Sequence, residues 1–579
     1  MSRLETYKEK KTKTPYIVMG LSISLIMIVS SILLYIYLLP STESVEYFQA
    51  ENDIIFEGEV MSTAYVVDDA IYFPFSFIQE EIDSSIVFDE NSNSIIITTS
   101  NKVLQLPSES LTYFINEEPF KLEVPALVTE AGERYINIDQ ILQIYPIEVK
   151  LNDETSAIIV QKHGQTLLTG VVEDKLNEHE SRLRVEPSLK SKYVAELDGN
   201  ESIIIEKDDH SEYYFIRKEN GIAGYIKKNS ISLNKPTTVN LTRDLRAEQR
   251  MLIDGPINLT WEAVYSKNPD TSTMPQMDGL NVVSPTWFSL KNNEGDVTNL
   301  GSTAYSEWAK QRNYQVWAVF SNDFDPEKTH EAFKDFDTRQ KIIRQILQYS
   351  QMYELDGINI DIENVNLEDG PLVTQFVREA TPYLHEAGLV VSMDVTFISE
   401  SENWSKFYER EKLADVVDYM MVMAYDEHWA SSPIAGSVAS FPWVENNLER
   451  ILEVIPNDRL ILGVPLYTRI WEEKENDNGE IEVSSKAHSI EFVREWMNER
   501  NLEPAYDEKS GQYYVEYMDE KEQAMYKIWI ENDYSLQKRA QIVHSYQLAG
   551  IATWARTFGN EGAWTALSDS LKHIQVTQK

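Results

Sequence analysis

The sequence predicts an α/β protein whose largest part is a (β/α)8 TIM barrel with an inserted α+β lobe. A transmembrane helix, a small repeated α+β module and a small β-barrel are expected to precede it. Three observations carry this prediction. They are an uncharged apolar run near the N-terminus, an internal repeat, and strand-like runs that alternate with helical segments after residue 236.

The apolar run covers residues 16–39, YIVMGLSISLIMIVSSILLYIYLL, and is long enough to span a bilayer as one helix. The basic residues before it are Arg3, Lys8, Lys10, Lys11 and Lys13, and acidic residues dominate after it. The positive-inside rule therefore predicts that residues 1–15 are cytoplasmic and that the later domains are extracytoplasmic. A cleaved signal peptide is the alternative. The run is longer than a usual signal core, and no small-x-small site follows it.

Residues 45–165 are predicted to form a module of two similar halves. The segment AIYFPFSFIQEEIDSSIVFDENSNSIIITT (residues 70–99) recurs as ERYINIDQILQIYPIEVKLNDETSAIIVQK (residues 133–162). Each copy has the pattern of a strand, a short helix and a hairpin, and two copies can bury each other's apolar faces. The pattern resembles the repeated N-terminal module of copper amine oxidases. No copper is expected, because the module has no histidine cluster and His163 stands alone.

Residues 166–235 change to short strands separated by turns. LRVEPS near the start and GIAGY near the end resemble a bacterial Src-homology-3-like domain, in which R-x-x-P-S and G-x-x-G-Y recur. The resemblance implies binding of cell-wall peptides. A rigid stalk is the alternative.

Residues 237–579 are predicted to hold the barrel. The strand-like runs are INLTWEAVY (257–265), LNVVSPTWF (280–288), YQVWAVFS (314–321), GINIDIE (357–363), LVVSMDVTF (389–397), YMMVMAYD (419–426), RLILGVPLY (459–467) and GIATWAR (550–556). Helical spacing lies between most of them, which predicts closure into a barrel. The gap at residues 468–549 is too long for one crossover. It is expected to hold a lobe that walls one side of a cleft, with GQYYVEYM as one strand.

The composition excludes several kinds of function. The chain of 579 residues has no cysteine, which rules out disulfides, thiolate metal sites and cysteine nucleophiles. Its formal net charge of −42 argues against nucleic acid as a partner and fits a neutral or cationic substrate. Solubility in a salty or alkaline medium would give the same bias. The sequence shows no cofactor signature and no metal site, so neither is expected.

The stretch LDGINIDIEN (355–364) points to the chemistry. Isoleucines alternate with polar residues, as in a strand with one apolar face. In a barrel, Ile358, Ile360 and Ile362 would pack on helices, while Asn359, Asp361 and Glu363 would face the lumen near the catalytic mouth. The alternative is a buried structural network, which is rare for carboxylates.

The spacing of the two carboxylates narrows the reaction. Residues two apart on a strand lie about 6.5–7 Å apart on the same side. They cannot easily flank a sugar from opposite sides, as the acid and nucleophile of most glycosidases do. One can protonate a leaving oxygen, but the nucleophile must come from elsewhere. A 2-acetamido group on the substrate is an obvious source.

DGINIDIE is similar to the D-G-x-D-x-D-x-E signature of glycoside hydrolase family 18, the family of chitinases and endo-N-acetylglucosaminidases. Further segments resemble its peptidoglycan-cleaving bacterial branch, which includes spore-cortex-lytic enzymes. They are NVVSPTWF, DYMMVMAYDEHWASSPIAGSVASFPWVE, ILGVPLYTRIW, the WIE of residues 529–531 and Trp554. The resemblance covers roughly residues 250–570 and implies cleavage of β-1,4 bonds after N-acetylglucosamine.

The resemblance implies catalytic roles for three residues. Glu363 is expected to protonate the glycosidic oxygen and then to act as base for water. Asp361 is expected to orient the acetamido group, to stabilise the oxazolinium and to raise the pKa of Glu363. Tyr425 is expected to hydrogen-bond the acetamido carbonyl.

The resemblance also implies a substrate-binding set: Asn359, Asp426, Trp554, Trp429, His428 and Trp287. Asp426 would hold the distorted sugar and Trp554 would form the floor beneath it, with core packing as the alternative for Trp554. Asn359 stands where many chitinases have aspartate. It is expected to hydrogen-bond Asp361 without taking a proton. A structural role is the alternative for His428 and Trp429, and it is expected for Asp356.

The sequence therefore predicts a membrane-anchored, extracytoplasmic, retaining glycosidase that acts on N-acetylated cell-wall glycan, namely peptidoglycan. A chitinase is one alternative. The other is a catalytically inactive glycan-binding wall scaffold, against which the intact Glu363 argues.

Overall fold

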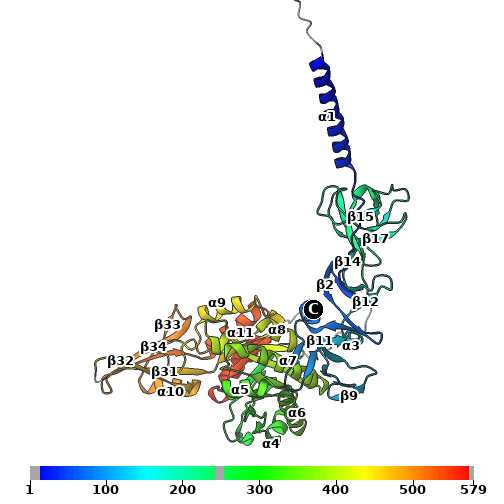
Figure 1. Cartoon of the computed structure of the whole chain (residues 1–579). Helices are drawn as coiled ribbons and strands as arrows, with labels where there is room; N and C mark the ends of the chain where they lie inside the picture. The colour runs from blue at the N-terminus through cyan, green and yellow to red at the C-terminus, as the bar shows by residue number, and fades with distance from the viewer. Residues whose placement is uncertain (1–13, 242–252, 477, 573–579) are drawn as a thin grey trace, which may run out of the picture. The chain divides into compact units, whose positions relative to one another are not determined.

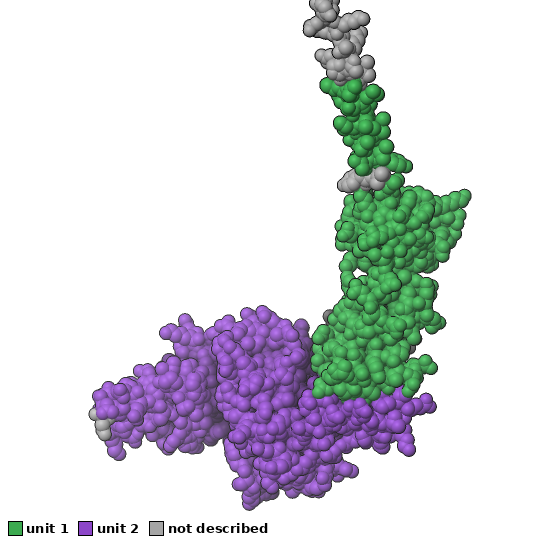
Figure 2. All heavy atoms as spheres, viewed as in Figure 1, with its two compact units in different colours: residues 1–84, 127–245 green, residues 85–126, 246–579 purple. Residues whose placement is uncertain are grey.

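The computed structural model describes residues 14–241, 253–476 and 478–572. The chain forms two compact units, one of residues Met1–Ser84 and Leu127–Leu245 and one of Ser85–Ala126 and Arg246–Lys579 (Figure 2). The basic residues predicted to precede the membrane span all lie outside the described residues.

The first unit begins with helix α1 (Thr14–Leu38), which coincides with the predicted apolar run (Figure 1). Its window Val18–Tyr35 has a mean hydropathy of 2.2, and none of it is buried. By length and composition, α1 can cross a membrane.

The two halves of the repeat have the predicted order of strand, helix and hairpin. The first half is β4 (Ala70–Pro74), α2 (Phe75–Phe77), η1 (Ile78–Ile82), β5 (Val87–Asp89) and β6 (Ser94–Thr98). The second half is β11 (Glu133–Asn137), α3 (Ile138–Ile144), β12 (Ile147–Leu151) and β13 (Ile158–Lys162). Strands β4 and β11 pair antiparallel, so the two halves do meet.

The two hairpins of the repeat go to different units. The second hairpin pairs with β1 (Asp53–Phe56), which also pairs with β2 (Glu59–Thr63). The first hairpin extends through β7 (Val103–Pro107), β8 (Thr112–Ile115) and β9 (Glu118–Lys121) into a sheet of the second unit. The remaining strand here, β10 (Leu127–Glu130), pairs with β11. Residues 45–165 therefore contribute to both compact units.

Residues 166–238 form an antiparallel sheet in the order β16-β15-β19-β18-β17-β14-β20. Its strands are β14 (Thr166–Val172), β15 (Arg182–Arg184), β16 (Tyr193–Glu196), β17 (Ser202–Lys207), β18 (Tyr213–Lys218), β19 (Ala223–Lys227) and β20 (Ile231–Leu233). Strand β21 (Thr237–Thr238) also pairs with β14, so the sheet extends past the expected border at residue 235. The Src-homology-3-like resemblance of this segment stays a prediction.

The second unit contains a closed (β/α)8 barrel, as the sequence predicts. Its parallel strands are β22 (Ile257–Glu262), β23 (Val282–Pro285), β26 (Gln315–Ser321), β27 (Gly357–Asp361), β28 (Val390–Thr396), β29 (Tyr419–Met423), β30 (Leu460–Pro465) and β36 (Gly550–Trp554). Strand β22 pairs with both β23 and β36, which closes the ring. A short hairpin of β24 (Phe288–Leu290) and β25 (Val297–Asn299) extends β26 at its upper end.

Several helices of the barrel begin at a capping side chain. The helices are α4 (Thr303–Lys310), α5 (Pro326–Phe333), α6 (Phe336–Met352), α7 (Gly370–Glu386), α8 (Arg410–Val416), α9 (Phe441–Ile451), α11 (Asp533–Ser545) and α12 (Glu561–Leu571). Ser302, Asp325 and Asp335 each accept a backbone N–H of the first turn that follows. Such a cap stabilises a helix by about 1 kcal/mol.

The alternating faces of β27 point as predicted. Its isoleucines are fully buried in the outer core, together with residues of α6 and α7 such as Ile346 and Phe376. The lumen has a separate apolar cluster, which includes Trp261, Trp317 and Tyr419. Polar side chains therefore occupy only the upper lumen of this strand, where the site lies.

The predicted lobe between the last two barrel strands is a sheet in the order β32-β31-β35-β34-β33, with one helix (Figure 1). Its elements are β31 (Tyr467–Glu475), β32 (Ile481–Ser489), α10 (Ile490–Glu499), β33 (Ala505–Asp507), β34 (Gln512–Asp519) and β35 (Ala524–Ile530). Strand β34 contains the predicted QYYVEYM. Ile470, Val493 and Ile528 form a small core of its own.

The sheet β5–β9 packs on the outside of the barrel within the second unit. Ile96 and Val103 join the outer core of the barrel. At the end of β5, Asp89 Oδ2 accepts the backbone N–H of Phe336 at 2.8 Å, at the start of α6. Beside it, Arg339 and Glu379 form a buried ion pair with Nη2–Oε1 at 2.8 Å.

Candidate active site

Asp361 and Glu363 lie at the C-terminal end of β27, the fourth strand of the barrel. Their side chains share a hydrogen bond. Glu363 lines a groove, whereas Oδ1 of Asp361 is buried and has no hydrogen-bond partner among the described residues. Between them, the carbonyl oxygen of Ile362 accepts the hydroxyl of Tyr408 at 2.8 Å, which fixes the chain where the strand ends.

Both carboxyl groups retain protons more strongly than in water. Burial raises the pKa of Asp361 to about 7, against a lowering effect of its hydrogen bond with Glu363. Burial also raises the pKa of Glu363 well above its usual value, and the charges of Asp361 and Asp426 raise it further. The direction is the predicted one, but burial contributes more than the like charge. A raised pKa of this kind suits Glu363 to donate a proton.

Asn359 makes contacts that differ from those predicted. Its Nδ2 donates to Asp394 Oδ2 at 2.8 Å and its Oδ1 accepts from Ser392 Oγ at 2.9 Å, so both amide atoms bond to β28. The expected hydrogen bond to Asp361 was wrong, because the neighbouring strand presents two polar side chains at the height of the amide.

Asp394 is a lumenal residue that the sequence reasoning missed. It is 3% exposed and lies on β28, one strand away from Asp361. Burial raises its pKa well above the usual value, Asp361 and Glu363 raise it further, and hydrogen bonding from Asn359 lowers it. A lone carboxylate in the apolar run LVVSMDVTF was the signal that could have identified it.

Tyr425 and Asp426 follow β29, next to the carboxyl groups. Burial raises the pKa of the Tyr425 phenol well above its usual value, with Asp394 and Glu363 as the strongest charges acting on it. Asp426 Oδ1 accepts the hydroxyl of Tyr467 at 2.6 Å and Nη2 of Arg469 at 3.1 Å. Both donors come from β31 of the lobe. They belong to the run LYTRIW, to which no individual role was assigned.

The groove above these residues has a volume of about 750 Å³. That volume lies within the range typical of small-molecule sites, about 300–1,000 Å³. Three indoles line it: Trp404, Trp429 and Trp443. Trp404 is 43% exposed and Trp429 is 51% exposed, so their rings can contact a ligand. Trp429 was predicted to lie here, and the other two were not.

The remaining predicted residues have mixed placements. Trp554 ends β36, is half-buried, and packs on Trp261 with ring centroids 6.0 Å apart at the upper lumen. His428 contacts the loop beside it, with Nδ1 2.9 Å from the carbonyl oxygen of Ser437. The prediction that Trp287 binds substrate was wrong. This residue is 1% exposed in the outer core, where its indole N–H donates to Asn268 Oδ1 at 2.7 Å, so it cannot contact a substrate.

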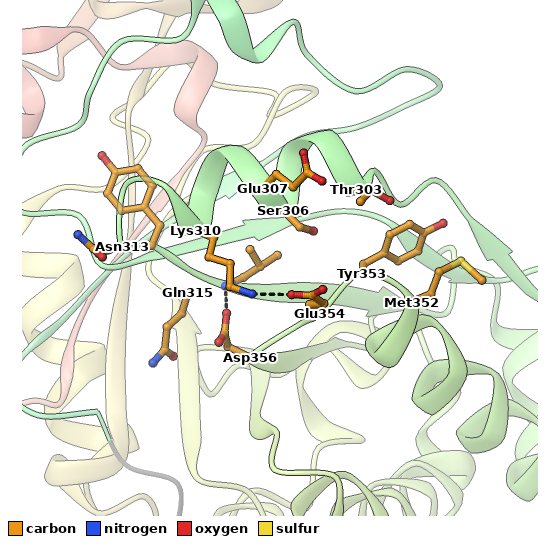
Figure 3. A pocket seen from close by; sticks show the side chains of 12 residues that line it. Thr303, Ser306, Glu307, Lys310, Asn313, Gln315, Met352, Tyr353, Glu354 and Asp356 are labelled. Carbon is orange, nitrogen blue, oxygen red and sulfur yellow. Dashed lines mark hydrogen bonds and ion pairs between the residues drawn. The ribbon is translucent and has the colours of Figure 1, made fainter.

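A smaller hollow lies at the opposite end of the barrel strands, with a volume of about 290 Å³ (Figure 3). Lys310 forms an ion pair with Glu354 there, and Asp356 Oδ2 accepts the backbone N–H of Val316 at 2.9 Å. Asp356 thus joins the starts of β26 and β27, which agrees with the structural role expected for it.

Two family models match the chain. The model described as "Glycosyl hydrolases family 18" matches residues 262–559, which include the groove and both carboxyl groups. The model described as "Copper amine oxidase N-terminal domain" matches residues 55–160, which include the internal repeat.

Similar proteins have been described in Bacillus. The chain is 26% identical over 304 residues to "Uncharacterized glycosylase YvbX" of Bacillus subtilis (strain 168), covering 51% of this chain and 85% of that protein. It is 22% identical over 288 residues to "Cortical fragment-lytic enzyme" of the same organism, covering 48% of this chain and 64% of that protein. The crystal structure of the Bacillus megaterium spore cortex-lytic enzyme SleL aligns with a TM-score of 0.49 and 18% identity, covering 59% of this chain and 78% of that chain.

Proposed function

The chain belongs to glycosyl hydrolases family 18, and from this premise we propose that it is a membrane-anchored hydrolase of cell-wall glycan. The bond cut is the β-1,4 linkage that follows N-acetylglucosamine in peptidoglycan. The reaction is retaining and substrate-assisted, with Glu363 as acid and then base.

The observation that carries the proposal is the hydrogen-bonded pair of Asp361 and Glu363 at the floor of the groove. The carboxyl group of Glu363 holds a proton because its pKa is raised. It donates this proton to the glycosidic oxygen as the bond from C1 to that oxygen breaks. The acetamido carbonyl oxygen of the same sugar attacks C1 and forms a cyclic oxazolinium. Asp361, as the anion, stabilises the positive charge.

The second half of the reaction uses the same residues. Glu363, now a carboxylate, takes a proton from water, whose oxygen attacks C1 and opens the oxazolinium. Two displacements at C1 retain the anomeric configuration, and Glu363 regains its proton. Tyr425 contributes a hydroxyl donor to the acetamido carbonyl, since it follows β29 beside the two carboxyl groups.

Among the described residues, the carboxyl groups nearest to the pair are already held by protein groups and are not free to act as the nucleophile of the usual double-displacement mechanism. Asp426 is held by Tyr467 and Arg469, and Asp394 is buried under Asn359. Such an enzyme needs a carboxylate on the face of the sugar opposite the acid. Asp361 shares the strand and the face of Glu363, which favours the substrate as its own nucleophile.

The groove suits an N-acetylated glycan. The indoles of Trp404, Trp429 and Trp443 offer apolar faces to sugar rings. Peptidoglycan is favoured over chitin because one similar protein of Bacillus subtilis is a cortical fragment-lytic enzyme. A chitinase is the second candidate, since mammalian di-N-acetylchitobiases are also similar to this chain.

The location proposed for the protein rests on α1. The helix is long and apolar enough to cross a membrane and lies near the N-terminus. As an uncleaved anchor it would place the groove outside the cell. Membrane fractionation of cells that carry a C-terminally tagged chain tests this: recovery of the intact chain in the membrane supports an anchor, and a shorter, released chain indicates a signal peptide.

Purified chain in detergent should be incubated with purified peptidoglycan and, separately, with chitin oligomers. The products are then reduced and analysed by mass spectrometry. Reduced N-acetylglucosamine ends from peptidoglycan support the proposal, and cleavage of chitin alone supports the chitinase. Glu363→Gln should abolish release, whereas Glu368→Gln, a matched change at an exposed carboxylate, should not. If the wild type cleaves neither glycan, the protein is a binding scaffold.

A further inference from the structure

Asp394 is a third carboxyl group in the upper lumen, and the proposed mechanism does not use it. Its Oδ2 accepts Nδ2 of Asn359 at 2.8 Å, while its Oδ1 is buried and has no hydrogen-bond partner among the described residues. Oδ1 of Asp361 is also buried and without a hydrogen-bond partner among the described residues. Two buried carboxyl oxygens on adjacent strands therefore lack the donors that an ionised carboxylate requires.

On the basis of the proposed function, we infer that Asp394 is a positioning residue that holds a proton in the active enzyme. In this state the one negative charge of the lumen belongs to Asp361, and the hydroxyl of Tyr425 remains available to the substrate. When Asp394 loses its proton, the enzyme is switched off.

The neighbours of Asp394 make a second charge in the lumen unfavourable. Asp361 and Glu363 face it from the end of β27, and they are the charged groups that act on it most strongly. Trp261 faces Asp394 from β22. A charge on Asp394 also raises the pKa of the phenols of Tyr425 and Tyr408. These neighbours offer acids, phenols and an indole, so an ionised Asp394 beside an ionised Asp361 would lack a compensating cation.

Tyr425 connects Asp394 to the substrate. Among the charged groups that act on the Tyr425 phenol, Asp394 is the strongest. An anionic Asp394 would attract the phenolic proton and would compete with the acetamido carbonyl for it. A neutral Asp394 competes much less, because a carboxylic acid is a weaker acceptor than a carboxylate.

Asp394 should ionise before Glu363 as the pH rises. Asn359 donates to Asp394 Oδ2, which favours its anion, whereas Glu363 faces the acidic Asp361 and Asp426. The loss of activity on the alkaline side would then report Asp394 and not the catalytic acid. Asn359 cannot hold a proton, so in this chain the proton-holding group lies one strand away, on β28.

The test is the pH profile of kcat/KM on 4-methylumbelliferyl N,N′-diacetylchitobioside for the wild type, Asp394→Asn and Asp394→Ser. We expect the alkaline limb of the pH profile to move up by about one pH unit in both variants, because neither has the carboxyl group of Asp394 whose deprotonation causes the loss of activity. The acid limb should stay in place. If both limbs move down, Asp394 was anionic. If neither limb moves, Asp394 is merely structural. Either result would overturn the inference.

Asp418→Asn is the matched control, since Asp418 is a buried aspartate directly before β29 that accepts the backbone N–H of Val391 at 2.8 Å. Both limbs of the pH profile of Asp418→Asn should stay where they are in the wild type. An infrared difference spectrum at neutral pH, wild type minus Asp394→Asn, should contain the carbonyl band of a protonated carboxyl group, and its absence would also overturn the inference. This measurement needs no turnover, so it remains decisive even if the wild type cleaves no glycan and the proposed function fails.

Discussion

Asn322 holds the backbone of Glu363 by both of its polar groups. The side-chain Oδ1 accepts the N–H of Glu363 at 3.1 Å, and Nδ2 donates to its carbonyl oxygen at 2.7 Å. The ladder between β26 and β27 ends at the pair Ser321 and Asp361. One residue beyond that pair, the amide of Asn322 supplies the hydrogen bonds that a further backbone pair would have made. Glu363 therefore lies past the end of its strand and is still fixed.

Asn322→Ala should lower kcat by about 10–100-fold, because Glu363 would lose its position relative to the groove. The buried backbone groups that lose their partner should also lower the free energy of unfolding by about 1–3 kcal/mol. Thr329→Val is the control. It removes the contact of Asn322 Nδ2 with the Thr329 hydroxyl at 2.8 Å and the hydrogen bond from that hydroxyl to the carbonyl oxygen of Asp325 at 2.6 Å, but it leaves both contacts with Glu363. Steady-state kinetics and thermal melts of both variants test this, and equal kcat values in both would contradict it.

Asp361→Asn should change how stability depends on pH. The pKa of Asp361 rises from 3.8 to about 7 on folding, so the folded state retains this proton longer than the unfolded state does. Its contribution to stability is therefore lost as pH rises from about 4 through about 7. Without this group, the variant should gain about 1–3 kcal/mol relative to the wild type between pH 5 and pH 8.

Melting temperatures at the two pH values measure this difference. Glu368→Gln, at an exposed carboxylate, should show the same difference from the wild type at both pH values. A pH-independent difference for Asp361→Asn would mean that Asp361 is ionised in the folded protein as readily as in the unfolded one.

Tyr467→Phe should lower kcat/KM by about 10–100-fold. The hydroxyl of Tyr467 donates to Asp426 at 2.6 Å, and a hydrogen bond to a charged group contributes about 1.5–3 kcal/mol. Tyr513→Phe, on β34 of the same lobe, is the control and should leave kcat/KM unchanged. If the two variants behave alike, the lobe supports the groove without orienting Asp426.

Glu379→Ala should destabilise the barrel by about 3–5 kcal/mol, because it leaves the guanidinium of Arg339 buried without its partner. Both side chains are at most 2% exposed, and Gln340 and Gln375 also donate to Glu379. The double variant Arg339→Met/Glu379→Leu should recover most of this loss, since it removes both charges. Urea unfolding followed by circular dichroism measures both values. A double variant no more stable than Glu379→Ala would contradict the explanation.

The sequence predicted the structure correctly where a local pattern of residues is compatible with only one local structure. Alternation along GINIDIE correctly assigned Ile360 to the helices and Asp361 to the lumen, and all eight barrel strands were predicted. Asp394, Tyr467 and Arg469 were missed because their importance depends on which strands become neighbours. Trp287 was misplaced for a similar reason, since an indole in a strand-like run can face either side of the sheet.

The repeat shows the same limit at the scale of domains. Its two halves have nearly the same pattern, but one hairpin pairs with β1 and the other forms a sheet with β7. The choice depends on β7 to β9, which come from residues between the two copies and have no counterpart in the repeat.

The path of residues 85–126 has a consequence for proteolysis at the cell surface. The chain passes between the two units three times, after residues 84, 126 and 245. A cut after residue 245 alone would leave the second unit attached to the first, since the sheet β5–β9 still contacts α6 through Asp89 and Phe336. Release of the second unit without the first would require all three crossings to be cut.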